Sequence, residues 1–376
     1  MPPSDPRAPS ATPDTTAKLE APPVPVSTWE GALGISVVLC CHNGASKLPH
    51  ALEYLARQRV PKSLTWEVIL VDNASTDGSG GVAEDSWREN RSPVPLRVVI
   101  EAQLGLAFAR NRGVRAAKYS IIVFVDDDNW LEVDYLARAW EIMESLPSVG
   151  IAFGRSDGVF ERQPPGWFRM VQQHYAIGSL GDSPQDVTGD GTLPWGAGMV
   201  MRKSALSDLM GLGFAHRLTG RQGSRLSSCE DSELSLALML AGWRLRFDPR
   251  LALRHFMPEA RMEWSYFRKL FGGQCESAAL LDPYYIALGK TGNEAMLRSP
   301  RLAWWCQCAR GLYWLFRHNK LLAFVPVSVL PDGSPRSLPL LAYRSRLRLL
   351  LRSPREYIEA HRAVATLLSQ LRNRCQ

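Results

Sequence analysis

The sequence carries two groups of acidic residues, each directly after a short apolar run. Asp72 opens the segment DNASTDGS after the run EVILV, and Asp126, Asp127 and Asp128 follow the run SIIVFV. Three adjacent carboxylates repel one another, so packing alone gives no reason to gather them. Mg²⁺ or Mn²⁺ gives a reason, because both ions prefer carboxylate oxygens and accept phosphate oxygens as further ligands. The second group therefore predicts a divalent cation site, whereas the first is also good turn and helix-capping chemistry.

A third acidic segment, SCEDSE at residues 228–233, opens a predicted helix. Ser228 and Asp231 have the S-x-x-D spacing of a capping box. An apolar stripe that starts at Leu234 follows, and Gly242 is expected to end the helix. Acidic side chains also interact favourably with the positive end of a helix dipole. These residues alone therefore predict a well-capped helix N-terminus.

The elements that must position these residues alternate between strands and helices. We expect strands at residues 35–41, 67–71, 96–100 and 120–125, with helices at 46–58, 104–118 and 132–146. Such alternation predicts a mostly parallel sheet covered by helices on both faces, and ligands bind beyond the carboxyl ends of its strands. Residues 155–195 read as irregular. A strand and helix return at 195–206, a helix at 229–241 and a strand near Phe247, and helices alone follow residue 260.

The ordered set of motifs resembles glycosyltransferase family 2, whose members have the GT-A fold. The matching segments are ISVVLCCHNGASKL, VDNASTDGS, GLAFARNRG, FVDDDNW, WGAGMVMRKSAL and CEDSELSLALMLAGWRL. Their order along the chain, rather than any single segment, carries the specificity. The resemblance implies a GT-A domain with an open, mostly parallel sheet over residues 34–260. A proline-rich disordered tail at residues 1–33 precedes it, and a helical, basic extension at 261–376 follows it.

The resemblance also implies roles for single residues. Asp231 matches the general base that removes the acceptor proton. Asp128 matches the metal ligand of the DxD pair, and His255 matches a second ligand that several enzymes of this fold class use. The other residues that we expect to bind the nucleotide sugar are His42, Asn43, Asp72, Asn73, Arg110, Asp126, Asp127, Trp195, Gly196 and Glu230.

Several of these residues have a structural interpretation as well. Asp231 fits a helix cap, and Arg110 fits an ordinary surface arginine near a helix start. His255 fits a polar residue at the end of a strand. Trp195 and Gly196 fit a core indole beside a tight turn.

The implied reaction is transfer of one sugar from a nucleotide diphosphate sugar to an acceptor hydroxyl, with inversion and with Mg²⁺ or Mn²⁺. The acceptor would be a saccharide or lipid-linked saccharide of a bacterial surface polysaccharide. Processive members carry a QxxRW motif and transmembrane helices, and the sequence shows neither. Two alternatives stay open. A nucleotidyltransferase should show a glycine-rich phosphate loop, which HNGASKL matches poorly, and a non-catalytic nucleotide-sugar-binding module would not need the Glu230–Asp231 pair.

Cysteine and charge bear on location and partners. The seven cysteines lack paired spacing, so we expect free thiols in a reducing cytoplasm rather than disulfides or zinc. No apolar run is long enough to span a bilayer, and the start of the chain does not resemble a secretory signal.

The basic charge is concentrated at the end of the chain. Residues 301–376 hold twelve arginines and one lysine against three acids, a local net charge of +10 in a chain of +7. Arginine and tryptophan on an amphipathic helix suit the surface of an anionic membrane, here the inner face of the plasma membrane. A helical cap with solvated arginines explains the same pattern equally well. No nucleic-acid-binding motif accompanies the charge, so we expect no nucleic acid partner.

Overall fold

The computed structural model describes residues 31–221, 226, 228–292, 294–318, 333–334 and 337–374. The proline-rich tail predicted at residues 1–33 therefore lies almost wholly outside the described residues. The predicted division of the rest into 34–260 and 261–376 stays a prediction.

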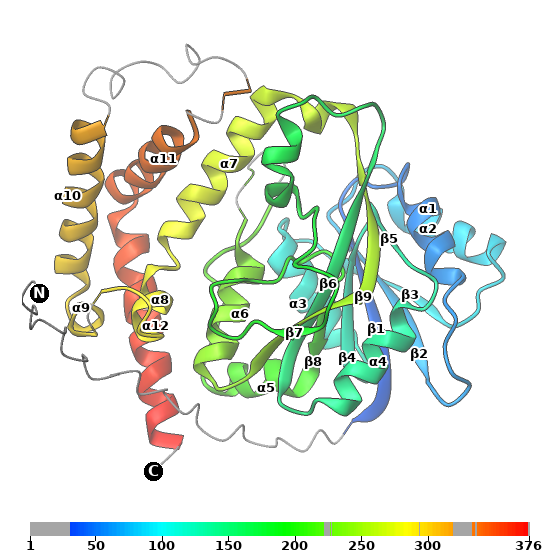
Figure 1. Ribbon diagram of the computed structural model, residues 1–376. Coiled ribbons are helices and arrows are strands. Elements are labelled where there is room, and N and C mark those ends of the chain that lie inside the picture. Colours follow the sequence, from blue (N-terminus) through cyan, green and yellow to red (C-terminus); the bar gives the residue numbers. More distant parts are fainter. Residues whose placement is uncertain are drawn as a thin grey trace, which may run out of the picture.

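A nine-stranded sheet forms the centre of the molecule (Figure 1). Eight of its strands follow the order β3-β2-β1-β4-β8-β6-β9-β5, and β7 pairs with β9. The strands are β1 (Ala32–Cys41), β2 (Trp66–Asn73), β3 (Leu96–Glu101), β4 (Tyr119–Asp126), β5 (Asn129–Leu131), β6 (Val149–Phe160), β7 (Gln185–Asp186), β8 (Val200–Arg202) and β9 (Arg244–Met257).

The first four strands pair in parallel, as the sequence predicts. Their register places Cys41 opposite Asp72 on β2 and Cys40 opposite Asp126 on β4. The two acidic groups therefore lie at the same edge of the sheet, beyond the carboxyl ends of its strands. Strand β8 continues the sheet antiparallel to β4 and β6, and β6 then pairs in parallel with β9. The expected GT-A-type mixed sheet is thus confirmed.

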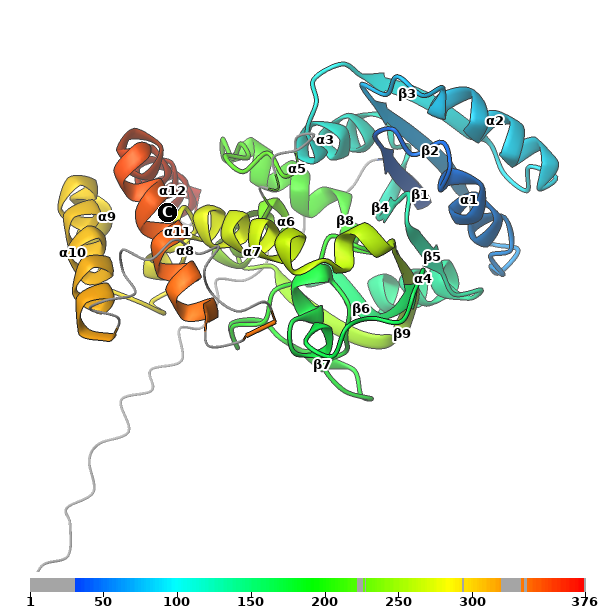
Figure 2. The ribbon, with the colours of Figure 1, turned by 90° about the horizontal axis from the view of Figure 1, so that it is seen from above.

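Helices cover both faces of the sheet. Along β1, Val37 and Val38 point to opposite faces, and each belongs to a different buried apolar cluster. Helices on one face share the cluster of Val37, and helices on the other share the cluster of Val38 (Figure 2). The first group is α1 (Leu48–Ala56), α2 (Ser79–Glu89) and α4 (Tyr135–Ser145), and the second is α3 (Leu106–Ala116), α5 (Lys203–Gly211) and α6 (Glu230–Leu240).

The expectation that residues 155–195 are irregular is partly wrong. Strand β6 runs on to Phe160, and residues 155–160 pair with β9. The register shifts at Gly154, where an added Cβ would lie 2.0 Å from the carbonyl oxygen of Leu251. Glycine at this position lets the two strands stay paired through the bend. Two short 3₁₀ helices follow, at Phe168–Met170 and Gln172–Tyr175.

The segment after residue 260 is helical, as predicted. Another 3₁₀ helix, Glu259–Met262, leads into α7 (Trp264–Ala279), α8 (Asp282–Ala287), α9 (Ala295–Arg298), α10 (Pro300–His318), α11 (Leu338–Arg352) and α12 (Pro354–Arg374). Leu340 of α11 and Val364 of α12 belong to the same buried cluster as Val38 of β1. The C-terminal helices therefore share a core with one face of the sheet. No helix within the described residues has the length and apolar character that a membrane crossing needs.

Candidate active site

A cavity of about 760 Å³ opens at the edge of the sheet where the acidic groups meet. Its wall comes from the ends of β1 and β4, the start of α6 and the side of α7. Eleven of the thirteen predicted site residues line it, namely His42, Asn73, Arg110, Asp126, Asp127, Asp128, Trp195, Gly196, Glu230, Asp231 and His255. Asn43 and Asp72 are not among the lining residues. The structure thus brings two acidic segments that are distant in the sequence into one space.

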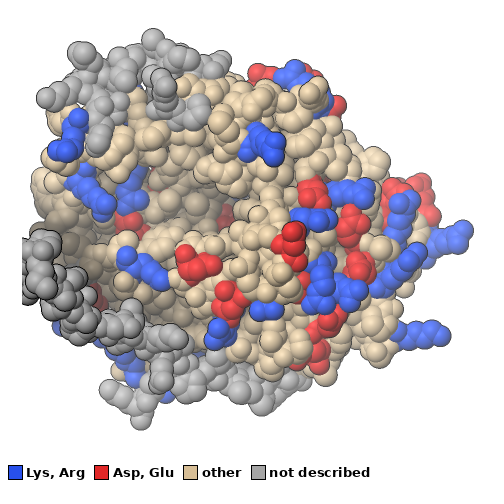
Figure 3. Space-filling model, viewed as in Figure 1, with Lys and Arg blue, Asp and Glu red and all other residues tan. Residues whose placement is uncertain are grey.

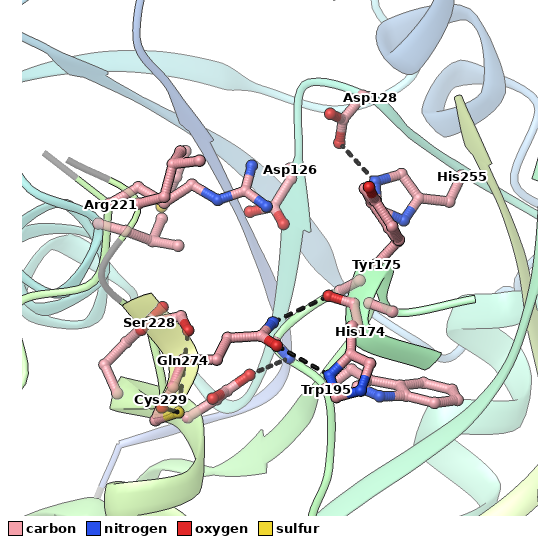
Figure 4. Close-up of a pocket in the computed structure, with 18 of the residues that line it drawn as sticks. Asp126, Asp128, His174, Tyr175, Trp195, Arg221, Ser228, Cys229, His255 and Gln274 are labelled. Carbon is pink, nitrogen blue, oxygen red and sulfur yellow. Dashed lines mark hydrogen bonds and ion pairs between the residues drawn. The ribbon is translucent and has the colours of Figure 1, made fainter. Parts of the chain in front are cut away.

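Asp128 is buried and lies between two basic side chains. Its Oδ1 atom lies 3.4 Å from Nε2 of His255, and its Oδ2 atom lies 2.8 Å from Nη1 of Arg261 (Figure 4). Burial alone would raise the pKa of Asp128, but His255 and Arg261 hold that pKa well below its ordinary value. The carboxylate is therefore ionised. Among the described residues, no three His, Cys, Asp or Glu side chains gather into a metal-binding group.

Asp127 has a different partner. Its Oδ1 atom accepts a hydrogen bond of 3.0 Å from Nζ of Lys47, which lies between β1 and α1. Burial and the negative charge of Asp128 raise the pKa of Asp127 to about 6, despite the lysine. Gly44 is required here, because a Cβ at that position would lie 2.1 Å from Oδ2 of Asp127. Asp127 therefore holds the turn after β1 in place through its contact with Lys47. The run of three aspartates in the sequence does not predict this contact.

Arg110 lines the cavity and links the two acidic segments. Its guanidinium is buried, with Nη1 lying 3.2 Å from Oε1 of Glu230 and Nη2 lying 3.9 Å from Oδ1 of Asp126. The interpretation of Arg110 as a surface arginine is therefore wrong, because helix α3 turns this side chain inward. Burial and the charge of Asp231 raise the pKa of Glu230 to about 7, and Arg110 opposes that rise. Oε2 of Glu230 is buried without a hydrogen-bond partner, which fits a carboxyl group that readily takes up a proton.

Asp231 is held at the first turn of α6 by two backbone amides. Its Oδ2 atom accepts a hydrogen bond of 2.8 Å from the N–H of Gly196, and its Oδ1 atom accepts one of 2.7 Å from Ser232. Gly196 also makes room for Arg110, because a Cβ there would lie 2.2 Å from its Nη2 atom. The small residue thus allows close approach by protein groups on both sides.

The predicted capping box at Ser228 is wrong. Helix α6 begins at Glu230, the N-cap residue is Cys229, and no side chain caps the helix. Cys229 has φ of 76°, the left-handed region that is costly for a residue with a Cβ. This conformation ends the loop one residue before the Glu230–Asp231 pair, so both acids stand in the first turn. Gly242, with φ of 90°, follows the end of the helix as expected.

The turns after β1 and β2 hold each other. Nδ1 of His42 lies 2.8 Å from the carbonyl oxygen of Asn73, and the N–H of Asn43 donates to Oγ of Ser75. Asp72 accepts a hydrogen bond from the N–H of Ser75 and does not cap α2, which begins at Ser79 with Gly78 as its N-cap residue. The amide of Asn73 donates to two backbone carbonyls and accepts from a third backbone group, so it braces the loop before α3. Nucleotide contacts by these four predicted residues stay predictions.

The opposite wall of the cavity contains residues that motif reasoning missed. His174 and Gln274 form two hydrogen bonds of 2.9 Å, which join the 3₁₀ helix at Gln172–Tyr175 to α7 (Figure 4). Trp195 lies beside this pair in Figure 4 and packs edge-on against Phe153. Arg261, Arg221 and Lys47 also line the cavity. Arg261 and Arg221 lie outside the matching segments and Lys47 lies within one of them, but none of the three is among the residues that the motifs predicted for the site.

These features define a class of protein. A mixed α/β sheet has one acidic group at the end of β4 and a second at the start of a later helix, facing one cavity, as in GT-A glycosyltransferases. Residues 36–210 match the family model described as glycosyl transferase family 2. The chain belongs to glycosyltransferase family 2 and is related to bacterial polysaccharide glycosyltransferases.

Individual relatives are distant or matched over short stretches. The putative glycosyltransferase EpsH of Bacillus subtilis is 31% identical over 102 residues, which is 27% of this chain and 28% of that protein. The succinoglycan biosynthesis protein ExoM of Rhizobium meliloti is 23% identical over 66% of this chain and 76% of its own length. The crystal structure of S. aureus TarS 1-349 in complex with UDP-GlcNAc has 17% identity and a TM-score of 0.50, covering 91% of this chain and 92% of that one. This last likeness supports the fold.

Proposed function

We propose that the protein transfers a single sugar from a UDP-sugar to an acceptor hydroxyl, with inversion at the anomeric carbon, in the synthesis of a bacterial surface polysaccharide. One observation carries the proposal. The carboxylate of Asp231 and the carboxylates of Asp126 and Asp128 line the same cavity from two different elements. This arrangement offers a proton acceptor on one side and a place for a diphosphate on the other.

The chemistry assigns each group a step. Asp231 takes the proton of the acceptor hydroxyl while the oxygen of that hydroxyl bonds to the anomeric carbon. The bond from that carbon to the diphosphate oxygen breaks on the opposite side, and its electron pair stays with the diphosphate. The hydrogen bonds from Gly196 and Ser232 hold Asp231 in place, since its two oxygens have fixed partners. Arg110 sets the position of Glu230 and Asp126 around the same space.

The residues present fit a divalent cation in part. Asp128 and His255 place an oxygen and a nitrogen 3.4 Å apart inside the cavity, close enough for one ion to contact both. Mg²⁺ and Mn²⁺ commonly bind through few protein ligands together with substrate phosphates and water. We therefore assign Asp128 and His255 as the protein ligands. When bound, the ion would neutralise charge on the departing diphosphate.

The proposed nucleotide of the donor and the proposed class of acceptor are supported by the relatives. The UDP-GlcNAc bound to TarS supports a uridine nucleotide donor, and ExoM supports polysaccharide synthesis. Aromatic side chains that line the same cavity, among them Trp195 and Tyr175, suit stacking against sugar rings. Carboxylates at two ends of one cavity distinguish this proposal from a module that only binds nucleotide sugars.

The test is slow donor hydrolysis without acceptor. The protein would be incubated with a panel of nucleotide sugars, with Mn²⁺ or with chelator, and released sugar would be followed by NMR. We expect one uridine diphosphate sugar to yield nucleoside diphosphate and a first-formed sugar of inverted configuration. Release with retained configuration would contradict the mechanism. Pyrophosphate exchange with a sugar phosphate would instead indicate a nucleotidyltransferase, and tight binding without hydrolysis would indicate a binding module.

A further inference from the structure

The outer half of helix α10 is apolar and exposed. Leu302, Trp305, Leu312, Tyr313 and Phe316 expose between 43% and 63% of their surface. Among the exposed large hydrophobic residues in the described part of the chain, all the aromatic ones lie on this helix. Figures 1 and 2 both place α10 at the outer edge of the C-terminal helices, far from the strands of the sheet.

These side chains form one continuous face. With 3.6 residues per turn, residues 302, 305, 309, 312, 313 and 316 fall within about one third of the helix circumference. Every one of them is exposed, and Ala309 and Cys306 lie within the same face. We call residues 302, 305, 306, 309, 312, 313 and 316 the outer face of α10. Such a face costs free energy in water, so its size calls for a function.

Arginines border the outer face on both sides. Arg301 lies along one margin, and Arg310 and Arg317 lie along the other, all exposed. Nη1 of Arg317 lies 3.1 Å from the hydroxyl of Tyr313, which ties this margin to the aromatic centre. Residues 300–318 contain no aspartate or glutamate. The outer face is therefore an apolar strip with cationic margins.

The inner half of α10 is already packed. Nε1 of Trp304 donates a hydrogen bond of 2.7 Å to the carbonyl of Leu350, and Trp314 stacks on Tyr343 with ring centroids 3.8 Å apart. Both partners lie on α11. The helix is thus fixed in orientation by one face, and its opposite face points away from α11.

We propose that the outer face of α10 binds the interfacial layer of an anionic membrane. Tryptophan and tyrosine prefer the boundary between headgroups and acyl chains, and arginines at the margins reach the anionic headgroups. The charge pattern selects this partner, since a strip bordered by cations without an acid complements a negative surface. The ten residues 321–330 that follow in the sequence also carry no charged side chain. This function is separate from sugar transfer, and it places the enzyme beside lipid-linked saccharides.

The test uses the full chain and vesicles of two compositions. We expect the protein to sediment with phosphatidylglycerol vesicles, to bind phosphatidylcholine vesicles at least tenfold more weakly, and to lose the difference in high salt. The triple variant W305S/Y313S/F316S should lower binding to phosphatidylglycerol at least tenfold. Its matched control is I100S, which changes an equally exposed residue of β3 at the far side of the sheet and should bind like the unchanged protein.

A second pair of variants separates charge from apolar burial. R301Q/R310Q/R317Q should reduce binding to anionic vesicles at least tenfold and flatten its salt dependence, because each cation near such a surface contributes about a fivefold factor. R88Q, which changes an exposed arginine of α2, should leave both the binding and its salt dependence unchanged. Quenching of tryptophan fluorescence by brominated phosphatidylglycerol should fall in W305F.

Three results would overturn the proposal. The first is a protein that ignores phosphatidylglycerol vesicles at low salt. The second is a W305S/Y313S/F316S variant, folded by circular dichroism, that still binds like the unchanged protein. The third is concentration-dependent self-association that the same variant abolishes while vesicle binding is absent throughout, because the outer face would then be an interface between two copies of this chain.

Discussion

Replacing Asp231 by asparagine removes the proposed base while keeping its size. At present one oxygen accepts from the N–H of Gly196 and the other from the N–H of Ser232. Asparagine keeps one acceptor, and its NH₂ group must face the second backbone donor. Loss of one hydrogen bond to a charged group costs about 1.5–3 kcal/mol of folding free energy. Loss of a general base lowers the rate of transfer about 10²–10⁴-fold, which corresponds to roughly 3–5 kcal/mol in the activation barrier.

A matched variant separates these two costs. Glu233 stands two residues further along the first turn of α6, is buried, and accepts hydrogen bonds from the backbone of Arg217 and Leu218. It does not line the cavity. Both backbone groups donate to the same oxygen, so Glu233→Gln keeps an acceptor for them but removes the charge that strengthens both bonds. It should therefore also lose stability, yet it should transfer sugar at nearly the unchanged rate at a temperature where it is folded.

The assay measures urea unfolding, donor affinity by calorimetry, and transfer or donor hydrolysis by released nucleoside diphosphate. We expect Asp231→Asn and Glu233→Gln both to unfold at lowered urea concentrations and to bind donor alike. Only Asp231→Asn should lose turnover. If both variants lost turnover in proportion to their stability, Asp231 would be a structural residue of α6 and the assignment of the base would be refuted.

Three further predictions concern the charges around the cavity. Asp128→Ala should abolish any gain in uridine diphosphate affinity that Mn²⁺ gives over chelator, and calorimetry with an equal gain in the variant would contradict the metal assignment. Gly196→Ala should displace the guanidinium of Arg110 and cost about 1–3 kcal/mol in urea unfolding, because its Cβ would lie 2.2 Å from Nη2. Glu230 should make stability depend on pH. Its pKa rises from 4.5 to about 7 on folding, so the folded protein binds the extra proton between those values and wild-type stability falls as pH rises through that window. Glu230→Gln lacks this loss, so its stability relative to the wild type should improve by up to about 3 kcal/mol between pH 4.5 and 8. A constant difference across this range would contradict the raised pKa.

Much of the catalytic half could be predicted from periodicity and motif order. The runs ISVVLCC and SIIVFV are buried on both faces, which only a central parallel strand requires, and the structure confirms both in β1 and β4. Residues 155–160 escaped prediction because Arg155 and Asp157 interrupt the apolar pattern, and a strand with one solvated face tolerates them. The capping box failed for a local reason. Its spacing is correct, but the left-handed conformation of Cys229 starts the helix after the serine.

Most of the site residues that motif order predicts do line the cavity, but motif order does not show their partners. Lys47 lies in a matching segment without being an expected site residue, and Arg261 lies outside every matching segment. Each pairs with an aspartate that is more than seventy residues away along the chain. Such pairs form because burying a lone carboxylate is costly, so the fold must supply cations wherever acids gather. The sequence shows the acids, and only the topology shows which cation reaches which one.

The three consecutive aspartates consequently have three different roles. Asp127 is engaged by Lys47 and holds the turn after β1, while Asp128 is engaged by His255 and Arg261 at the far end of β9. Asp126 is the most exposed of the three, and its nearest cation, Arg110, lies at 3.9 Å. Asp126 is therefore the most accessible of the three carboxylates to a ligand in the cavity, whereas Oδ2 of Asp128 already pairs with Arg261. Arg261 contacts Oδ2 of Asp128 and His255 faces Oδ1, so Oδ1 is the oxygen that a cation would share with His255. The pairing of Arg261 with Oδ2 thus leaves Oδ1, on the side of His255, as the oxygen for the proposed metal site.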